Sequence, residues 1–186
     1  MTAAASVDDD VRIRLFCALA LPDDVVEEVV EWQAGLPHEG VRVVPPDNLH
    51  LTLAFLGHRP RRDVDPIAAE LEAAAAAAAP MSFTVRSYRE TRSVGMLVFD
   101  DEGGTGAALA TDVHARLERV GVYEREPRPW LPHLSVLRFR GRPRFRPELP
   151  DLGAIGPSGA AVYHSMLRPT GAQYVVLREF RLGRSC

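Results

Sequence analysis

The tetrapeptide His50-Leu51-Thr52-Leu53 returns later in the chain as His133-Leu134-Ser135-Val136. Each copy reads histidine, apolar residue, hydroxyl residue, apolar residue, and we call them the first and the second motif. Side chains alternate between the two faces of a β-strand, so the histidine and the hydroxyl of each motif share one face, about 7 Å apart. The apolar pair enters the core on the other face. Two such strands at one cleft would bring together two imidazoles and two hydroxyls.

This set of side chains suits phosphodiester chemistry. Cleaving a phosphodiester needs a base for the attacking oxygen and an acid for the leaving oxygen, and an imidazole with an unperturbed pKa near ~6.5 can serve as either. The hydroxyls of Thr52 and Ser135 can donate hydrogen bonds to non-bridging phosphate oxygens. We expect no metal and no cofactor, because the sequence offers no cluster of Asp, Glu and His suited to a metal. A single His-x-Thr in a strand is a common accident, so the inference depends on the repetition.

The segments around the motifs alternate between strand-like and helix-like patterns. Strand-like runs are expected at 12–19, 41–44, 49–56, 82–88, 95–100, 133–139, 160–167 and 173–182. One helix is expected to open at Pro22, a second at Asp65 as N-cap with Pro66 as first helical residue, and a third to run over 109–120 and stop at Gly121. Such mixing, with hairpin-length connections, favours an α+β fold with an antiparallel sheet.

Two further features have ordinary structural interpretations. A glycine-rich turn at 103–106 resembles a phosphate loop only faintly, because it lacks the Lys-Ser/Thr ending, and we interpret it as a strand-to-helix connection. Trp130, three residues before the second motif, is expected to be a core or rim aromatic rather than a platform for a base.

The composition excludes several classes of protein. The chain has 186 residues, its 22 basic residues are all arginine, and its formal charge is −3. A protein that coats nucleic acid or lies on an anionic membrane needs a strongly basic field, which this chain lacks as a whole. Arginines nevertheless gather at 125–146, where they form a local basic flank on both sides of His133. Cys17 and Cys186 form no disulfide framework, so we expect a cytoplasmic protein.

These residues resemble the 2H phosphoesterase superfamily, and within it the RNA 2′,3′-cyclic phosphodiesterase family, also called the 2′-5′ RNA ligase family. The resemblance covers nearly the whole chain. It is carried by the segments 14–22, 43–57 and 132–136 and by the late pattern Ser165-x-Leu167-x-Pro169-x-Gly171-x-x-Tyr174. The segment 87–93 departs from the family, because it is polar where members usually have a Gly/Phe-rich turn.

The resemblance implies a fold and a set of roles. The expected fold is bilobal α+β, with two pseudo-symmetric lobes of antiparallel sheet plus helices around a central cleft. It would form a single domain over 11–186 that follows a disordered acidic leader over 1–10. By similarity, His50 would donate a proton to the leaving oxygen and His133 would accept one from water. Thr52 and Ser135 would hold the phosphate.

Arg138 occupies a position, five residues after the second histidine, where the family often carries an arginine. A guanidinium suits a phosphate oxygen. Because five is odd, its side chain would lie on the face opposite His133 in an unbroken strand, so a role in the site requires a bend or bulge.

The implied function is metal-independent hydrolysis of an RNA or nucleoside 2′,3′-cyclic phosphate to a 2′-phosphate. The protein would act as a monomer on RNA termini or small cyclic nucleotides, without a membrane. Three alternatives stay open: 2′-5′ RNA ligation by the reverse reaction, hydrolysis of another cyclic phosphodiester, and a non-catalytic RNA-end-binding module. Binding alone would be served by Arg or Lys, so the presence of both histidines and both hydroxyls argues against the last.

Overall fold

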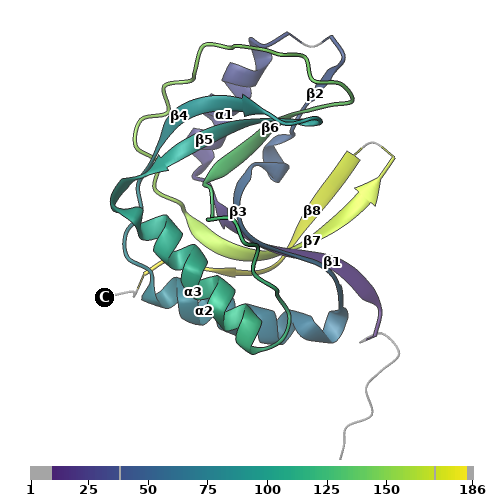
Figure 1. Ribbon diagram of the computed structural model, residues 1–186, viewed down its shortest axis with the longest axis vertical. Helices are drawn as coiled ribbons and strands as arrows, with labels where there is room; N and C mark the ends of the chain where they lie inside the picture. Colours follow the sequence, from purple (N-terminus) through teal and green to yellow (C-terminus); the bar gives the residue numbers. More distant parts are fainter. Residues whose placement is uncertain (1–9, 38, 170, 184–186) are drawn as a thin grey trace, which may run out of the picture.

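Eight strands form one antiparallel sheet in a computed structural model that describes residues 10–37, 39–169 and 171–183. The strand order is β4-β5-β6-β3-β1-β7-β8, and β2 pairs with β6 beside this path (Figure 1). The strands are β1 (Arg12–Ala20), β2 (Val41–Val43), β3 (His50–Pro60), β4 (Phe83–Glu90), β5 (Val94–Asp101), β6 (His133–Phe139), β7 (Gly159–Arg168) and β8 (Gly171–Phe180). The expected α+β class with an antiparallel sheet is confirmed.

Three helices pack on this sheet: α1 (Asp23–Ala34), α2 (Val64–Ala77) and α3 (Thr105–Arg119). Short 3-10 segments lie at Pro46–Asn48, Arg61–Asp63 and Glu102–Gly104. None of the described helices is long and apolar enough to cross a membrane. The leader expected over 1–10 falls outside the described residues except for Asp10, which pairs with Arg62.

The expected start of α2, with Asp65 as N-cap and Pro66 as first helical residue, is wrong by two residues. The 3-10 segment Arg61–Asp63 continues directly into the helix, and Asp63 takes the N-cap position. Pro66 then lies in the first turn, where backbone N–H groups have no intrahelical acceptor, so its missing N–H costs no hydrogen bond. At α3 the expected stop is confirmed, because Gly121 follows the cap residue Val120 with a left-handed φ of 75°.

The fold repeats a unit of strand, helix and motif strand. The first unit is β1, α1 and β3, the second is β5, α3 and β6, and in each the two strands pair antiparallel. The motif strands β3 and β6 join the two halves of the sheet through the pair Leu51 and Leu134. Figure 1 shows β4, β5 and β6 with α1 in the upper part of the molecule and β1 and β7 with α2 and α3 in the lower part.

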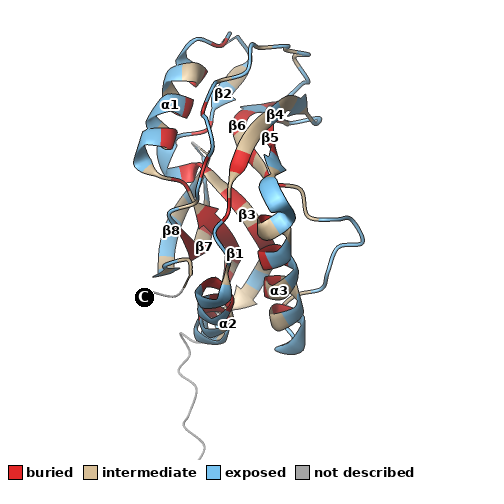
Figure 2. Ribbon diagram, turned by 90° about the vertical axis from the view of Figure 1, so that its left-hand side faces the viewer, coloured by how far each residue is buried: buried red, intermediate tan, exposed pale blue. Residues whose placement is uncertain are grey.

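The two faces of the sheet are buried to different extents. One large apolar cluster runs through both halves and takes in the inner sides of α2 and α3 (Figure 2). Along β1, Leu15, Cys17 and Leu19 belong to this core, whereas Phe16 and Ala18 face the other way. These two form a small separate cluster with residues of β7. The motif histidines lie on the face of this smaller cluster, since His50 stacks on Phe16.

The glycine-rich turn at 103–106 is a strand-to-helix connection, as expected. Gly103 and Gly104 both have φ near 70°, a conformation that glycine adopts without a steric cost. The N-terminus of α3 is already occupied by a carboxylate of the same chain, because Asp101 accepts N–H groups from Gly106 and Ala107 at 3.0 and 2.7 Å. An internal anion therefore takes the place that a phosphate would occupy in a phosphate loop.

We predict that Asp101→Ala lowers the free energy of unfolding by about 0.5–2 kcal/mol, because two N–H groups at the start of α3 lose their acceptor. Urea unfolding at neutral pH measures the change. Glu102→Ala, which removes an exposed carboxylate from the same connection, serves as a control for removing an acidic residue. Equal stability of Asp101→Ala and wild type would show that the carboxylate does not cap the helix.

Candidate active site

The pairing of the two motif strands places four polar side chains on one face of the sheet. Leu51 and Leu134 are direct antiparallel partners, and their side chains are 1% and 0% exposed. The residues on either side of these two leucines therefore project to the opposite face. His50, Thr52, His133 and Ser135 are these neighbours, and all four are partly exposed. The structure thus brings together the two imidazoles and two hydroxyls that the motifs predicted.

Both motif strands carry a bulge at the last residue of the motif. Over residues 50–56 and 133–139, the order of buried, intermediate and exposed positions is identical. In the ladder with β1, Cys17 pairs with Ala54 and Ala18 with Thr52, so Leu53 is skipped. In the ladder with β5, Gly95 pairs with Leu137 and Met96 with Ser135, so Val136 is skipped. Two consecutive residues enter the core at each bulge, and the alternation of faces reverses beyond it.

The bulge at Val136 decides where Arg138 lies. On an unbroken strand, the odd spacing of five residues would place Arg138 on the face opposite His133. The bulge turns Arg138 to the face of His133, as a role in the site requires. Arg138 is exposed, and its positive charge contributes to lowering the pKa of His50. The guanidinium therefore lies within electrostatic range of the imidazole.

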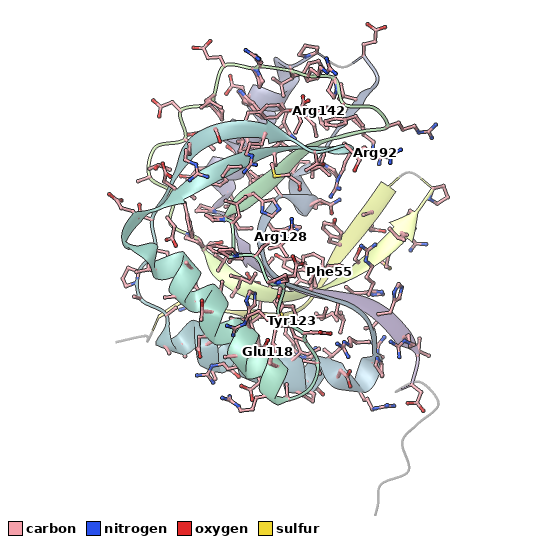
Figure 3. All side chains as sticks on the ribbon, viewed as in Figure 1. Phe55, Arg92, Glu118, Tyr123, Arg128 and Arg142 are labelled. Carbon is pink, nitrogen blue, oxygen red and sulfur yellow. The ribbon has the colours of Figure 1, made fainter. Side chains whose placement is uncertain are left out.

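Phe55 holds the corresponding position after the first motif, and the sequence analysis missed it. Its ring is 46% exposed, and the guanidinium of Arg14 lies 4.7 Å from the ring centroid. Figure 3 labels Phe55 near the centre of the molecule, between the upper and lower parts. The shared offset of five residues from each histidine was a signal that could have identified it. The two bulges thus present a cation in one half of the site and an aromatic ring in the other.

Helix side chains hold the backbone at each bulge. The carbonyl of Leu53 accepts a hydrogen bond from Nε2 of His114 at 2.8 Å. The carbonyl of Val136 accepts one from Nε2 of Gln33 at 2.7 Å. His114 belongs to α3 and Gln33 to α1, so each bulge is held by the helix of the other repeat. The skipped residues are not loose insertions, because their carbonyls are satisfied.

Trp130 contacts the backbone of the first motif. Its indole Nε1 donates to the carbonyl of Thr52 at 2.8 Å, and its ring meets Phe83 edge-on. The ring is partly buried. Trp130 is therefore a rim aromatic with a structural contact, as expected.

His50 lies in an aromatic surrounding formed by three strands. Its ring stacks on Phe16 with centroids 4.8 Å apart, and Tyr163 and Tyr174 lie at 5.7 and 5.3 Å. Nε2 of His50 lies 3.1 Å from Oγ1 of Thr52, within the same motif. The packed rings fix the orientation of the imidazole toward the hydroxyl.

Burial changes the protonation of His50. It lowers the pKa of the imidazole to about 4, and the positive charges of His133 and Arg138 act in the same direction. The free ring is therefore neutral at pH 7. An anion placed between these groups would favour the protonated ring, because it offsets their charge.

His133 is held in one tautomer. Its Nδ1 lies 2.9 Å from the carbonyl of Leu131, and a carbonyl can only accept, so Nδ1 carries the proton in the neutral ring. The lone pair of Nε2 is then free to take a proton. The two imidazoles thus differ in their packing, since His50 stacks on aromatic rings, although a backbone group of Asn48 also acts on its pKa. Among the described residues there is no group of three or more His, Cys, Asp or Glu side chains that could hold a metal.

We predict that acid destabilises the protein partly through His50. The folded-state pKa is about 4 and the unfolded value is near ~6.5, so the stability linked to this ring is complete above about pH 6.5 and falls as the pH approaches 4. Between about pH 7 and about pH 4.5, wild type should lose ~1–3 kcal/mol more than His50→Gln, which has no ring to protonate. Urea unfolding of both proteins at the two pH values gives the difference. An equal loss would contradict the shifted pKa.

We also predict that Gln33→Leu destabilises the protein by ~1–3 kcal/mol, because the buried carbonyls of Val44 and Val136 each lose a donor. Chemical unfolding measures the loss. The matched control is Gln173→Leu, since Gln173 lies exposed on β8 and should stay within ~0.5 kcal/mol of wild type. If both variants unfold at the same urea concentration, Gln33 does not hold the bulge.

Comparison with known proteins finds one group of relatives. Residues 19–92 match the family model described as LigT like phosphoesterase. An RNA 2′,3′-cyclic phosphodiesterase of Thermus thermophilus is 34% identical, over 91% of this chain and 90% of that protein. One of Escherichia coli is 33% identical, over 67% of this chain and 71% of that protein.

Solved structures show the same fold. A crystal structure of a Thermus thermophilus protein superposes with a TM-score of 0.78 at 31% identity, covering 91% of this chain and 98% of that one. Escherichia coli LigT in apo form gives a TM-score of 0.78 at 25% identity, covering 93% and 99%. Both motifs, the repeated unit that carries them and the likeness along most of the chain lead to one conclusion: this protein belongs to the LigT-like phosphoesterase family, within the 2H phosphoesterases.

Proposed function

We propose that the protein hydrolyses RNA or nucleoside 2′,3′-cyclic phosphates to 2′-phosphates by acid–base catalysis. The observation that carries the proposal is the placement of His50, Thr52, His133 and Ser135 on one face through the pair Leu51 and Leu134. The names of the relatives from Thermus thermophilus and Escherichia coli support the same substrate.

The different surroundings of the two histidines support different roles. His133, with Nδ1 protonated, offers the Nε2 lone pair to a proton of the attacking water. The new bond joins the water oxygen to phosphorus, and the bond from phosphorus to the 3′ oxygen breaks. His50 gives a proton from Nε2 to that leaving oxygen, which becomes the 3′ hydroxyl. The anionic substrate raises the pKa of His50 from its value of about 4 and so favours the protonated ring.

The remaining groups of the face hold the substrate. The hydroxyls of Thr52 and Ser135 donate to non-bridging oxygens, and Arg138 balances the charge that these oxygens carry in the transition state. Phe55 offers an exposed ring on which the base can stack. A structure of Escherichia coli LigT, 26% identical to this chain, is described as complexed with NADP+, which supports a site that admits nucleotides.

No step of this scheme requires a metal. The same acid and base can run in the reverse direction, so 2′-5′ ligation of RNA ends is chemically available to the site. We retain the expectation of a monomeric, cytoplasmic enzyme that acts on RNA termini or small cyclic nucleotides.

We predict that His50→Ala and His133→Ala each lower the rate by at least ~100-fold, because each removes one proton-transfer partner. The assay follows hydrolysis of a nucleoside 2′,3′-cyclic phosphate in the presence of EDTA and identifies the product isomer. His58→Ala is the matched control, since His58 lies exposed near the far end of the same strand as His50. Its activity should equal that of wild type.

Several outcomes would contradict the proposal. Binding without turnover by wild type would favour the non-catalytic RNA-end-binding module. Loss of activity with EDTA would refute the metal-independent mechanism. A 3′-phosphate product would show that the 2′ oxygen leaves and would overturn the assigned geometry.

A further inference from the structure

Glu90, at the end of β4, organises a loop that the catalytic scheme does not use. Its side chain is only 3% exposed. Its carboxylate accepts backbone N–H groups from Arg144 and Phe145 at 2.9 and 2.8 Å and the Nε–H of Arg142 at 3.3 Å. The hydroxyl of Tyr88 donates to it at 3.3 Å. A buried carboxylate is stable only with such partners, so the segment 140–150 is folded around one internal charge.

Two further observations show that this segment has a defined conformation. The carbonyl of Glu148 accepts a hydrogen bond from Nε1 of Trp32 at 2.8 Å, which ties the loop to α1. Arg144 has a φ of 60°, in the left-handed region that residues other than glycine seldom adopt. Such a conformation persists where surrounding contacts hold it, and here the N–H of Arg144 is held by Glu90.

The loop presents arginines to solvent while its own anion is buried. Exposed guanidinium groups come from positions 140, 142, 144 and 146 and, on the adjoining β4–β5 hairpin, from Arg89 and Arg92. We call these six residues the basic loop surface. Among the residues that the structure describes, only Arg142 of the six forms an ion pair, with the buried Glu90. The five other charges are available to an external anion.

The basic loop surface encloses a hollow. Its volume is about 540 Å³, and it is lined by Tyr88, Glu90, Phe145 and the arginines at 89, 142, 144 and 146. This volume falls within the range of sites that hold small ligands or parts of larger ones. Guanidinium groups beside aromatic rings are the combination that binds single-stranded nucleic acid, through phosphate contacts and stacking.

The chain connects this surface directly to the catalytic strand. β6 carries His133 and Ser135, continues to Arg138 and then enters the loop at Arg140. At about 3.3 Å per residue, Arg140 lies roughly 23 Å or less along the chain from His133. Figure 3 shows Arg92 and Arg142 in the upper half of the molecule, together with β4, β5 and β6. The strand that carries the second motif therefore leads directly into the basic loop surface.

We propose that the basic loop surface binds the sugar–phosphate backbone of the nucleotides that precede the terminal cyclic phosphate of an RNA strand. The inference rests on the proposed function and assigns its substrate class: RNA oligomers are preferred over single nucleotides. The contacts are to phosphates, so the preference depends on chain length and salt rather than on base sequence.

The test compares two substrates in one variant. Arg142→Ala/Arg144→Ala/Arg146→Ala should raise KM at least ~10-fold for an RNA decamer ending in a 2′,3′-cyclic phosphate at low salt. For a nucleoside 2′,3′-cyclic phosphate, kcat/KM should stay within about threefold, because a single nucleotide does not reach the loop. The slope of log KM against log salt for the decamer should fall by ~2, the value for three lost phosphate contacts on a single strand.

The control removes equal charge elsewhere. Arg61→Ala/Arg62→Ala/Arg178→Ala lowers the net charge by the same amount in the other half of the molecule. It should change neither KM for the decamer nor kcat/KM for the single nucleotide. Thermal unfolding of both triple variants verifies that they fold. The proposal would be overturned if the loop variant had the same KM for the decamer as wild type, or if its kcat/KM fell equally with both substrates.

A binding measurement separates this inference from the proposed function. Fluorescence anisotropy with a labelled RNA decamer ending in a 2′-phosphate reports binding without turnover. The loop variant should bind at least ~10-fold more weakly than wild type even if no hydrolysis is seen, a result that would refute the proposed function alone. Equal affinity of the two proteins would refute the RNA surface whatever the activity.

Discussion

The pairing of Leu51 with Leu134 is the contact on which the site depends. It joins the two halves of the sheet at its centre, and both leucines are buried in the main core. Because side chains on a strand alternate with a period of two, a slip of one residue on either strand would turn its histidine and hydroxyl into the core. Burial of the leucines therefore fixes the register that sets both imidazoles on one face.

The repeat also explains how one backbone geometry supports two different histidines. The bulges lie at the last residue of each motif, and each is held by a helix from the other repeat. The surroundings differ, since packed rings lower the pKa of His50 while a backbone carbonyl orients His133. The positions after the bulges differ as well, with Phe55 in one half and Arg138 in the other. In the proposed scheme, the acid, the base, the base-stacking ring and the phosphate-binding cation all come from one repeated unit with divergent side chains.

Much of the fold and the motif positions could be predicted from the sequence, because hydrophobic periodicity and the repeated motif are local signals. The odd spacing of five residues between His133 and Arg138 also called for a bend or bulge if Arg138 acts in the site, and the structure contains a bulge at Val136. The start of α2 was misplaced, because a 3-10 turn without a sequence signal extends the helix. Phe16, Tyr163 and Tyr174 come from three strands far apart in the chain, so only the sheet order brings them to His50. The polar segment 87–93, a departure from the family pattern, includes the Glu90 that anchors the basic loop.

The central claim is that both imidazoles act on one phosphate, with His50 neutral until the phosphate binds. The most direct test is an NMR titration of the imidazole resonances of His50 and His133, with and without a nucleoside 2′-phosphate. In the free protein, the His50 ring should stay neutral to about pH 5, and the ligand should shift both rings and raise the pKa of His50 by at least ~1 unit. A free His50 that titrates near ~6.5, or a ligand that leaves either ring unchanged, would contradict the claim.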